Sequence, residues 1–193
     1  MRRRDTVRMS YITIEESSLS HFLKNDTRIA VLWLVVRVYL GWEWLQAGWG
    51  KFNNPAWIGD NIGQGIGGFV QNALKKTADA CAPAPAVCHA DVQSWYAAFL
   101  QTFVQPYPEL WSYLITFGEI AVGIGLIVGC LTGLAAFFGF TMNLNFMLAG
   151  TVSTNPIMMV LAILLVCSWR VAGYWGLDQY VLPVVFRKRY LKR

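Results

Sequence analysis

Residues 37–51 read RVYLGWEWLQAGWGK and extend the apolar run IAVLWLVV at 29–36. The joined segment is typical of a transmembrane helix, since roughly 20 apolar residues cross a bilayer. It nevertheless contains Arg37, Glu43 and Lys51. A charged side chain in hydrocarbon is costly, so we expect these three to face the interior of a helical bundle. There they line a functional site or form ion pairs between helices.

The composition of the whole chain also indicates a membrane protein. Of 193 residues, 55% are hydrophobic and 14% are charged, whereas about a quarter of a soluble domain is charged. Nine tryptophans fit aromatic belts at the membrane interfaces. No apolar segment of a secretory signal follows the basic start MRRRDTVR. The first apolar run is therefore expected to remain as a transmembrane helix.

Four apolar segments predict four spans, at about 29–50, 110–131, 133–150 and 156–175. An extension of the fourth span towards Pro183 is left open. The expected fold is all-α, an integral membrane four-helix bundle. The predicted divisions are a cytoplasmic segment 1–28, a membrane domain 29–185 and a basic cytoplasmic tail 186–193.

The basic residues predict the orientation in the cytoplasmic membrane. Eleven of them flank the bundle, whereas the long connection 52–109 has only Lys75 and Lys76, with Lys51 at its edge. The positive-inside rule places both termini in the cytoplasm. The net charge of +5 then reflects orientation, and no nucleic-acid partner is expected.

The outward connection 52–109 is too long for an ordinary loop. Apolar residues at helical spacing predict an amphipathic surface helix over 91–104 and a weaker helix over 62–74. The glycine-rich GQGIGG at 63–68 lacks the strand that a dinucleotide site needs, so it is discounted.

The cysteines differ by location. Cys81 and Cys88 bound the segment CAPAPAVC in the outward loop, where oxidation is favoured, and a structural disulfide is predicted. A redox-active pair is the alternative. Cys130 and Cys167 are interpreted as small apolar residues.

Helical spacing and depth predict a polar pocket that opens outward. Two carboxylates, Glu43 and Glu119, are candidates for proton transfer in the outer half of the bundle. The candidate binding residues for a quinone or an anion are Arg37, Trp44, Lys51, Asn145 and Arg170. Trp44, Tyr113 and Phe138 are candidates for the aromatic walls of a quinone headgroup site, although packing is the ordinary role of such residues.

The assembled motifs resemble the DoxX/DoxD family of small four-helix membrane proteins. The resemblance lies in RVYLGWEWLQAGWGKFNNPAW, in the segment from WYAAFL to LTGLAA, and in GYWGLDQYVLP. The long outer loop and the GLD ending favour the DoxD-like branch. The resemblance implies a subunit of a thiosulfate:quinone oxidoreductase, which joins two thiosulfates into tetrathionate and reduces quinone. Other members of the family are described more loosely, as partners in redox complexes.

The residues limit the cofactors. His21 and His89 both lie outside the spans, so haem held by two transmembrane histidines is excluded. No zinc, iron–sulfur or flavin motif is visible, so redox chemistry by this chain alone would use bound quinone, cysteine thiols or direct transfer. The leading hypothesis is a quinone-linked membrane oxidoreductase subunit that oxidises thiosulfate or a related sulfur compound. The alternatives are a non-catalytic anchor for a redox partner and a small anion transporter. A second subunit or a homo-oligomer is expected.

Overall fold

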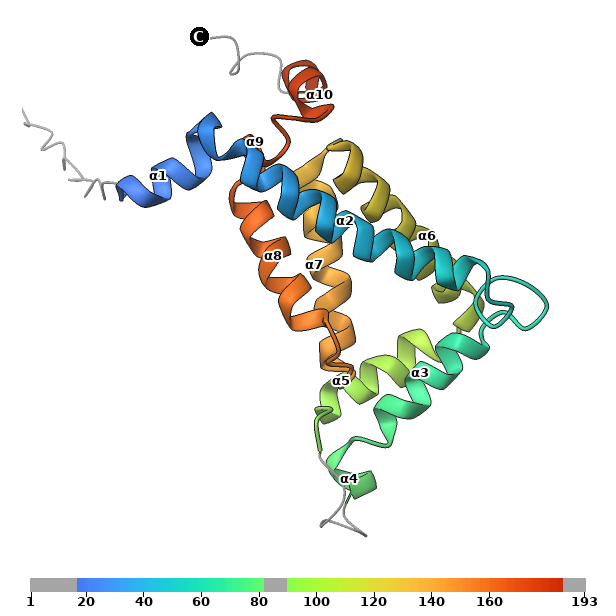
Figure 1. The fold of residues 1–193 in the computed structure, drawn as a ribbon. Helices are drawn as coiled ribbons and strands as arrows, with labels where there is room; N and C mark the ends of the chain where they lie inside the picture. The colour runs from blue at the N-terminus through green and yellow to red at the C-terminus, as the bar shows by residue number, and fades with distance from the viewer. Residues whose placement is uncertain (1–16, 82–89, 186–193) are drawn as a thin grey trace, which may run out of the picture.

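The protein is described by a computed structural model that covers residues 17–81 and 90–185. Within these ranges the secondary structure is helical, and no strand is present. Figure 1 shows a set of long helices with a smaller group of helices at one end and the N- and C-terminal helices at the other.

The first long helix follows a short amphipathic one. Helix α1 (Ser18–Asn25) begins where the Ser17 hydroxyl accepts a hydrogen bond from the Ser20 amide. A 3-10 turn, η1 (Thr27–Ile29), leads into α2 (Ala30–Phe52). The indole of Trp33 donates to the Leu23 carbonyl at 3.0 Å, which fixes α1 against α2.

Four helices form the body of the molecule. Helix α2 packs along α6 (Pro108–Val128), α6 packs against α7 (Thr132–Leu148), and α7 packs along α8 (Asn155–Cys167). Helix α8 also contacts α2. Three of these helices agree with the predicted spans 29–50, 110–131 and 133–150 to within a few residues.

The predicted fourth span is interrupted. Helix α8 ends at Cys167, and the chain continues as a single turn, α9 (Trp169–Ala172), and then as α10 (Asp178–Val185). The prediction of one continuous helix over 156–175 was therefore wrong. Beyond the break, the carbonyl of Ala172 at the end of α9 and that of Trp175 accept hydrogen bonds from Arg37.

The segment between α2 and α6 folds into a cap over one end of the four helices (Figure 1). It contains α3 (Gln64–Leu74), α4 (Ala78–Cys81), α5 (Ser94–Phe99) and a π-helical turn, η2 (Leu100–Val104). Two predicted surface helices are thus present, and GQGIGG forms the start of α3. Their buried faces, including Ile66, Val70 and Leu100, share one core.

Two hydrogen bonds connect the cap to α7 and the loop after it. The Tyr96 hydroxyl donates to the backbone carbonyl of Asn145 at 2.9 Å, and the Lys76 ammonium donates to the Gly150 carbonyl. Burial raises the pKa of Tyr96 to about 12, so this hydroxyl remains a donor at neutral pH. The cap is therefore held in a defined position over the helices.

The polarity of the helices is that of a membrane protein. Arg37, Thr116, Glu119 and Asn143 are buried, while large apolar side chains such as Val35 on α2 and many on α6, α7 and α8 are exposed. Two helical segments, Thr27–Phe52 and Pro108–Val128, are long and apolar enough to cross a bilayer. An apolar exterior around polar groups fits a lipid surrounding.

Glycines allow α2 and α6 to pack backbone against backbone. A Cβ atom added at Gly123 would lie 2.7 Å from the Leu45 amide nitrogen, and one at Gly41 would lie 2.9 Å from the Gly123 carbonyl. Small residues at such contacts are typical of helix pairs in membranes.

We predict that Gly123→Ala destabilises the protein by about 1–3 kcal/mol, because the added methyl group overpacks the contact between α2 and α6. Thermal unfolding of the purified protein in detergent measures the effect. Gly50→Ala is the matched control, since a Cβ atom there meets nothing within 4 Å. Equal unfolding temperatures for the two variants would contradict the close packing.

Candidate functional site

A cavity with a partly polar lining lies where the long helices meet the cap. Its volume is about 290 Å³. Helix α2 contributes the largest share of the wall, and α3, α6, α7, α8 and the loop before α8 complete it. Charged and aromatic side chains in its wall are those of Glu43, Trp44, Lys51, Trp57, Glu119 and Phe146.

A buried ion pair forms one wall. The Lys51 ammonium lies 2.9 Å and 2.7 Å from the two carboxylate oxygens of Glu119. Glu119 is 1% exposed, whereas Lys51 is 21% exposed. The carboxylate is therefore buried, and the ammonium that binds it is partly exposed at the cavity. The sequence predicts Glu119 in the outer half of the bundle and Lys51 at its outer boundary, and the structure brings the two side chains into contact.

Glu43 lines the same cavity without an ion-pair partner. Its side chain is partly buried, and no hydrogen bond or ion pair to it occurs among residues 17–81 and 90–185. The charged groups in the wall are thus Lys51, Glu43 and Glu119. One ammonium stands against two carboxylates, so the cavity does not present a net positive charge to a ligand.

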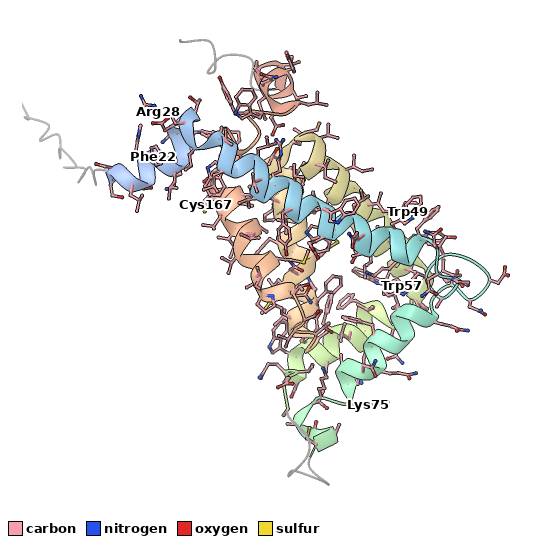
Figure 2. All side chains as sticks on the ribbon, in the orientation of Figure 1. Phe22, Arg28, Trp49, Trp57, Lys75 and Cys167 are labelled. Carbon is pink, nitrogen blue, oxygen red and sulfur yellow. The ribbon has the colours of Figure 1, made fainter. Side chains whose placement is uncertain are left out.

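Aromatic side chains form the rest of the wall. Lys51 lies over the ring of Trp57, 5.2 Å from its centre, a cation–π arrangement. Trp44 is buried, and its ring lies 6.4 Å from that of Phe146. Figure 2 places Trp57 beneath the end of α2 and Trp49 on the opposite, outer side of that helix.

Several buried polar atoms near this region have no hydrogen-bond partner. They include the indole nitrogen of Trp44, the hydroxyl of Thr116 and both polar atoms of the Asn143 side chain. Buried polar groups are ordinarily satisfied. Trp44 also lines the cavity, so its unpaired indole nitrogen belongs to a residue of the candidate site.

Arg37 lies at the other end of α2, far from this cavity. The rise of a helix places it roughly 21 Å from Lys51. Its guanidinium donates to the carbonyls of Ala172 at 3.3 Å and Trp175 at 3.1 Å. Arg37 thus binds the chain's own C-terminal segment, which explains why a charge is buried there.

Asp178 completes this inner contact. Its carboxylate accepts hydrogen bonds from the amides of Leu131 and Thr132, at the start of α7, where a negative charge is favourable. In the sequence, Asp178 is part of the GLD motif. Its role depends on a contact between segments about 46 residues apart.

Two of the predicted binding residues also lie outside the cavity. The Asn145 side chain accepts from Tyr96 at 3.2 Å and donates to the Thr141 carbonyl at 2.8 Å, so it holds the cap. Arg170 is exposed on α9 and lies over the Trp169 ring at 5.5 Å. Its expected inward position was wrong, because α8 ends before it.

The aromatic walls differ from the expectation as well. Trp44 lines the cavity, but the side chains of Tyr113 and Phe138 are 47% and 53% exposed on the outside of α6 and α7. Sequence reasoning missed Trp57 and the polar segment 151–155, which includes Ser153 and Thr154. No local pattern marks these residues, since they reach the cavity only through the fold of the cap and the α7–α8 loop.

Redox and metal ligands add little to the site. Cys81 is buried at the end of α4, but Cys88 lies outside the described residues, so their disulfide stays a prediction. Cys130 and Cys167 are free thiols. Within residues 17–81 and 90–185, no group of three metal-ligating side chains occurs.

We predict that Lys51→Met lowers the free energy of unfolding by about 3–5 kcal/mol, because it leaves the buried Glu119 carboxylate without its partner. The double variant Lys51→Met/Glu119→Gln should recover a large part of that loss. Unfolding of both in detergent measures the coupling. The exposed Lys75→Met serves as control, with an expected change of no more than about 1 kcal/mol. Additive losses would show that the pair does not interact.

Comparison with known proteins agrees with the resemblance seen in the sequence. The family model described as DoxX matches residues 32–153, which is more than half of the chain. No curated protein and no solved structure matches. The matched segment includes both members of the ion pair, whereas the GLD ending lies beyond it. The chain is therefore a membrane-associated protein that belongs to the DoxX family.

Proposed function

We propose that this chain is the quinone-binding membrane subunit of an oxidoreductase of the DoxD-like branch. In this arrangement α2, α6, α7 and α8 with α9 all cross the cytoplasmic membrane as a four-helix bundle. Both termini are cytoplasmic, and the cap faces outward. The distribution of basic residues and the apolar exterior of the helices support this placement.

The observation that carries the proposal is the Lys51–Glu119 ion pair on the wall of an aromatic-lined cavity. A quinone headgroup is a flat ring with two carbonyl oxygens. Aromatic walls suit the ring, and an ammonium is a suitable donor to a carbonyl oxygen. Reduction of quinone consumes two electrons and two protons. The Lys51 ammonium carries a proton that it can donate to a quinone oxygen, and the Glu43 and Glu119 carboxylates are suited to take up protons and pass them on.

The charge of the cavity suggests that the electron acceptor, quinone, and the electron donor, thiosulfate, bind at different places. Thiosulfate is a dianion, and two carboxylates beside one ammonium disfavour it. We therefore place oxidation of thiosulfate, or of a related sulfur compound, on a second subunit or another surface. The same charge argument disfavours the anion transporter.

A non-catalytic anchoring subunit is the second candidate. The hydrogen bonds of Arg37, Asp178 and Asn145 all hold parts of the chain together, so much of the polar interior has a structural role. The anchor hypothesis assigns the same role to Lys51 and Glu119.

Quinone reduction by the purified protein with its partner tests the proposal. We predict that Glu119→Gln folds normally but lowers the turnover of a short-chain quinone by at least about 100-fold, the usual contribution of general acid–base catalysis. Glu109→Gln is the matched control, because Glu109 is an exposed carboxylate on the same helix.

Quinone binding is measured separately, by quenching of tryptophan fluorescence without an electron donor. Wild-type turnover in folded Glu119→Gln, or no binding of quinone by the wild type, would favour the anchoring subunit. Quinone binding without reduction by thiosulfate would contradict only the identity of the donor.

A further inference from the structure

The indole of Trp57 contacts two parts of the chain that belong to different helices. The ammonium of Lys51, at the end of α2, lies 5.2 Å from the centre of the ring. Gly65, at the start of α3, lies so close that an added Cβ atom would be 2.5 Å from the Cε2 and Nε1 atoms of the same ring. Figure 2 shows Trp57 between the end of α2 and α3. The indole thus joins the cap to the Lys51 ammonium.

Backbone hydrogen bonds fix the loop that carries Trp57. The Trp57 amide donates to the Asn54 carbonyl at 2.9 Å, and the Gly65 amide donates to the Ala56 carbonyl at 2.9 Å. The Asn54 side chain also accepts from the Ala56 amide at 3.0 Å. The loop is therefore attached to α3 directly beside Trp57, and the indole meets Gly65 from a defined backbone position.

Gly65 belongs to the segment GQGIGG, which lacks the strand of a dinucleotide site. The close approach of the indole gives this glycine another role, since a residue without a side chain leaves room for the ring. Gly67 and Gly68 of the same segment differ, because a Cβ atom at either position meets nothing within 4 Å. The need for glycine is therefore specific to the position that supports Trp57.

The Lys51 ammonium depends on such a support because it ends a long and flexible side chain. Its hydrogen bonds to the two oxygens of Glu119 use two of its three N–H groups and leave one for a ligand. The side chain is partly exposed, so the ammonium needs a further contact that keeps it from turning towards solvent. An aromatic ring attracts a cation, and Trp57 and Lys51 line the same cavity.

We propose that Trp57 is a positioning residue of this site. Its indole, placed by Gly65 of the cap, holds the Lys51 ammonium beside Glu119 with one N–H group left for the ligand. Gly65 acts through the ring, since it is not part of the cavity wall. The assignment of that N–H group to a quinone oxygen rests on the function proposed above, whereas the positioning of the ammonium does not.

Acylation of Lys51 by an N-hydroxysuccinimide ester, followed by mass spectrometry, tests the positioning without quinone. We expect Gly65→Ala to raise the rate of Lys51 acylation roughly threefold, because displacing the ring removes a cation–π contact of this scale. Gly67→Ala is the matched control and should leave the rate unchanged. Acylation of Lys75 in the same spectra is the internal reference, and unfolding temperatures verify that each variant is folded. Equal rates for Lys51 in the wild type and Gly65→Ala would overturn the inference.

Trp57→Leu separates the positioning of Lys51 from a general loosening of the cap. Removal of the ring should raise Lys51 acylation by a similar factor. Gly65→Ala should then add nothing in the Trp57→Leu background, because no ring remains to be displaced. A further increase in the double variant would show that α3 loosens as a whole, which contradicts the proposal.

Quinone binding extends the test to the ligand. The affinity for a short-chain quinone, measured by quenching of tryptophan fluorescence, should fall roughly threefold in Gly65→Ala and stay unchanged in Gly67→Ala. Faster acylation of Lys51 without a loss of quinone affinity would overturn the link between the positioned ammonium and quinone. Absence of quinone binding by the wild type would contradict the proposed function, while the acylation rates would still decide the role of Trp57.

Discussion

The buried guanidinium of Arg37 constrains the rest of the structure. A charge inside the helices needs acceptors, and the carbonyls of Ala172 and Trp175 provide them. These carbonyls are accessible only because α8 ends early and the chain turns. The approach is so close that a Cβ atom at Gly129 or Gly176 would collide with the guanidinium. One buried charge thus fixes the C-terminal segment against α2.

At the opposite end of α2, the second buried charge is the carboxylate of Glu119 on α6. Lys51 pairs with Glu119 from the neighbouring helix and also reaches a cavity. The two ends therefore differ in what they offer a ligand. The Arg37 guanidinium binds backbone carbonyls of the protein, whereas the Lys51–Glu119 pair lies at a ligand-sized space. This contrast is the physical reason for placing quinone chemistry at the outer end.

The sequence predicts the helices well where the local pattern determines them. Helices α2, α6 and α7 follow from apolar length, and the cap helices follow from helical spacing. Glu43 and Glu119 were also predicted to share the outer half, with Lys51 at its boundary, and all three line one cavity. The break at Ser168, which leaves Arg170 exposed, was not predicted. The contact of Arg37 with Ala172 beyond the break joins residues more than 100 positions apart. Trp57 and Ser153 enter the cavity through loops whose course no periodicity reveals, and Asn145 was misinterpreted because its partner Tyr96 comes from the cap.

The central claim is that the cavity beside Lys51 and Glu119 holds a quinone headgroup. Photolabelling with an azidoquinone, followed by mass-spectrometric mapping of the modified peptides, tests it most directly. We expect labels between the end of α2 and Trp57 and on residues 146–158. Unmodified quinone should compete with this labelling. Labels spread over the lipid-facing residues of α6 and α7, without competition, would contradict it.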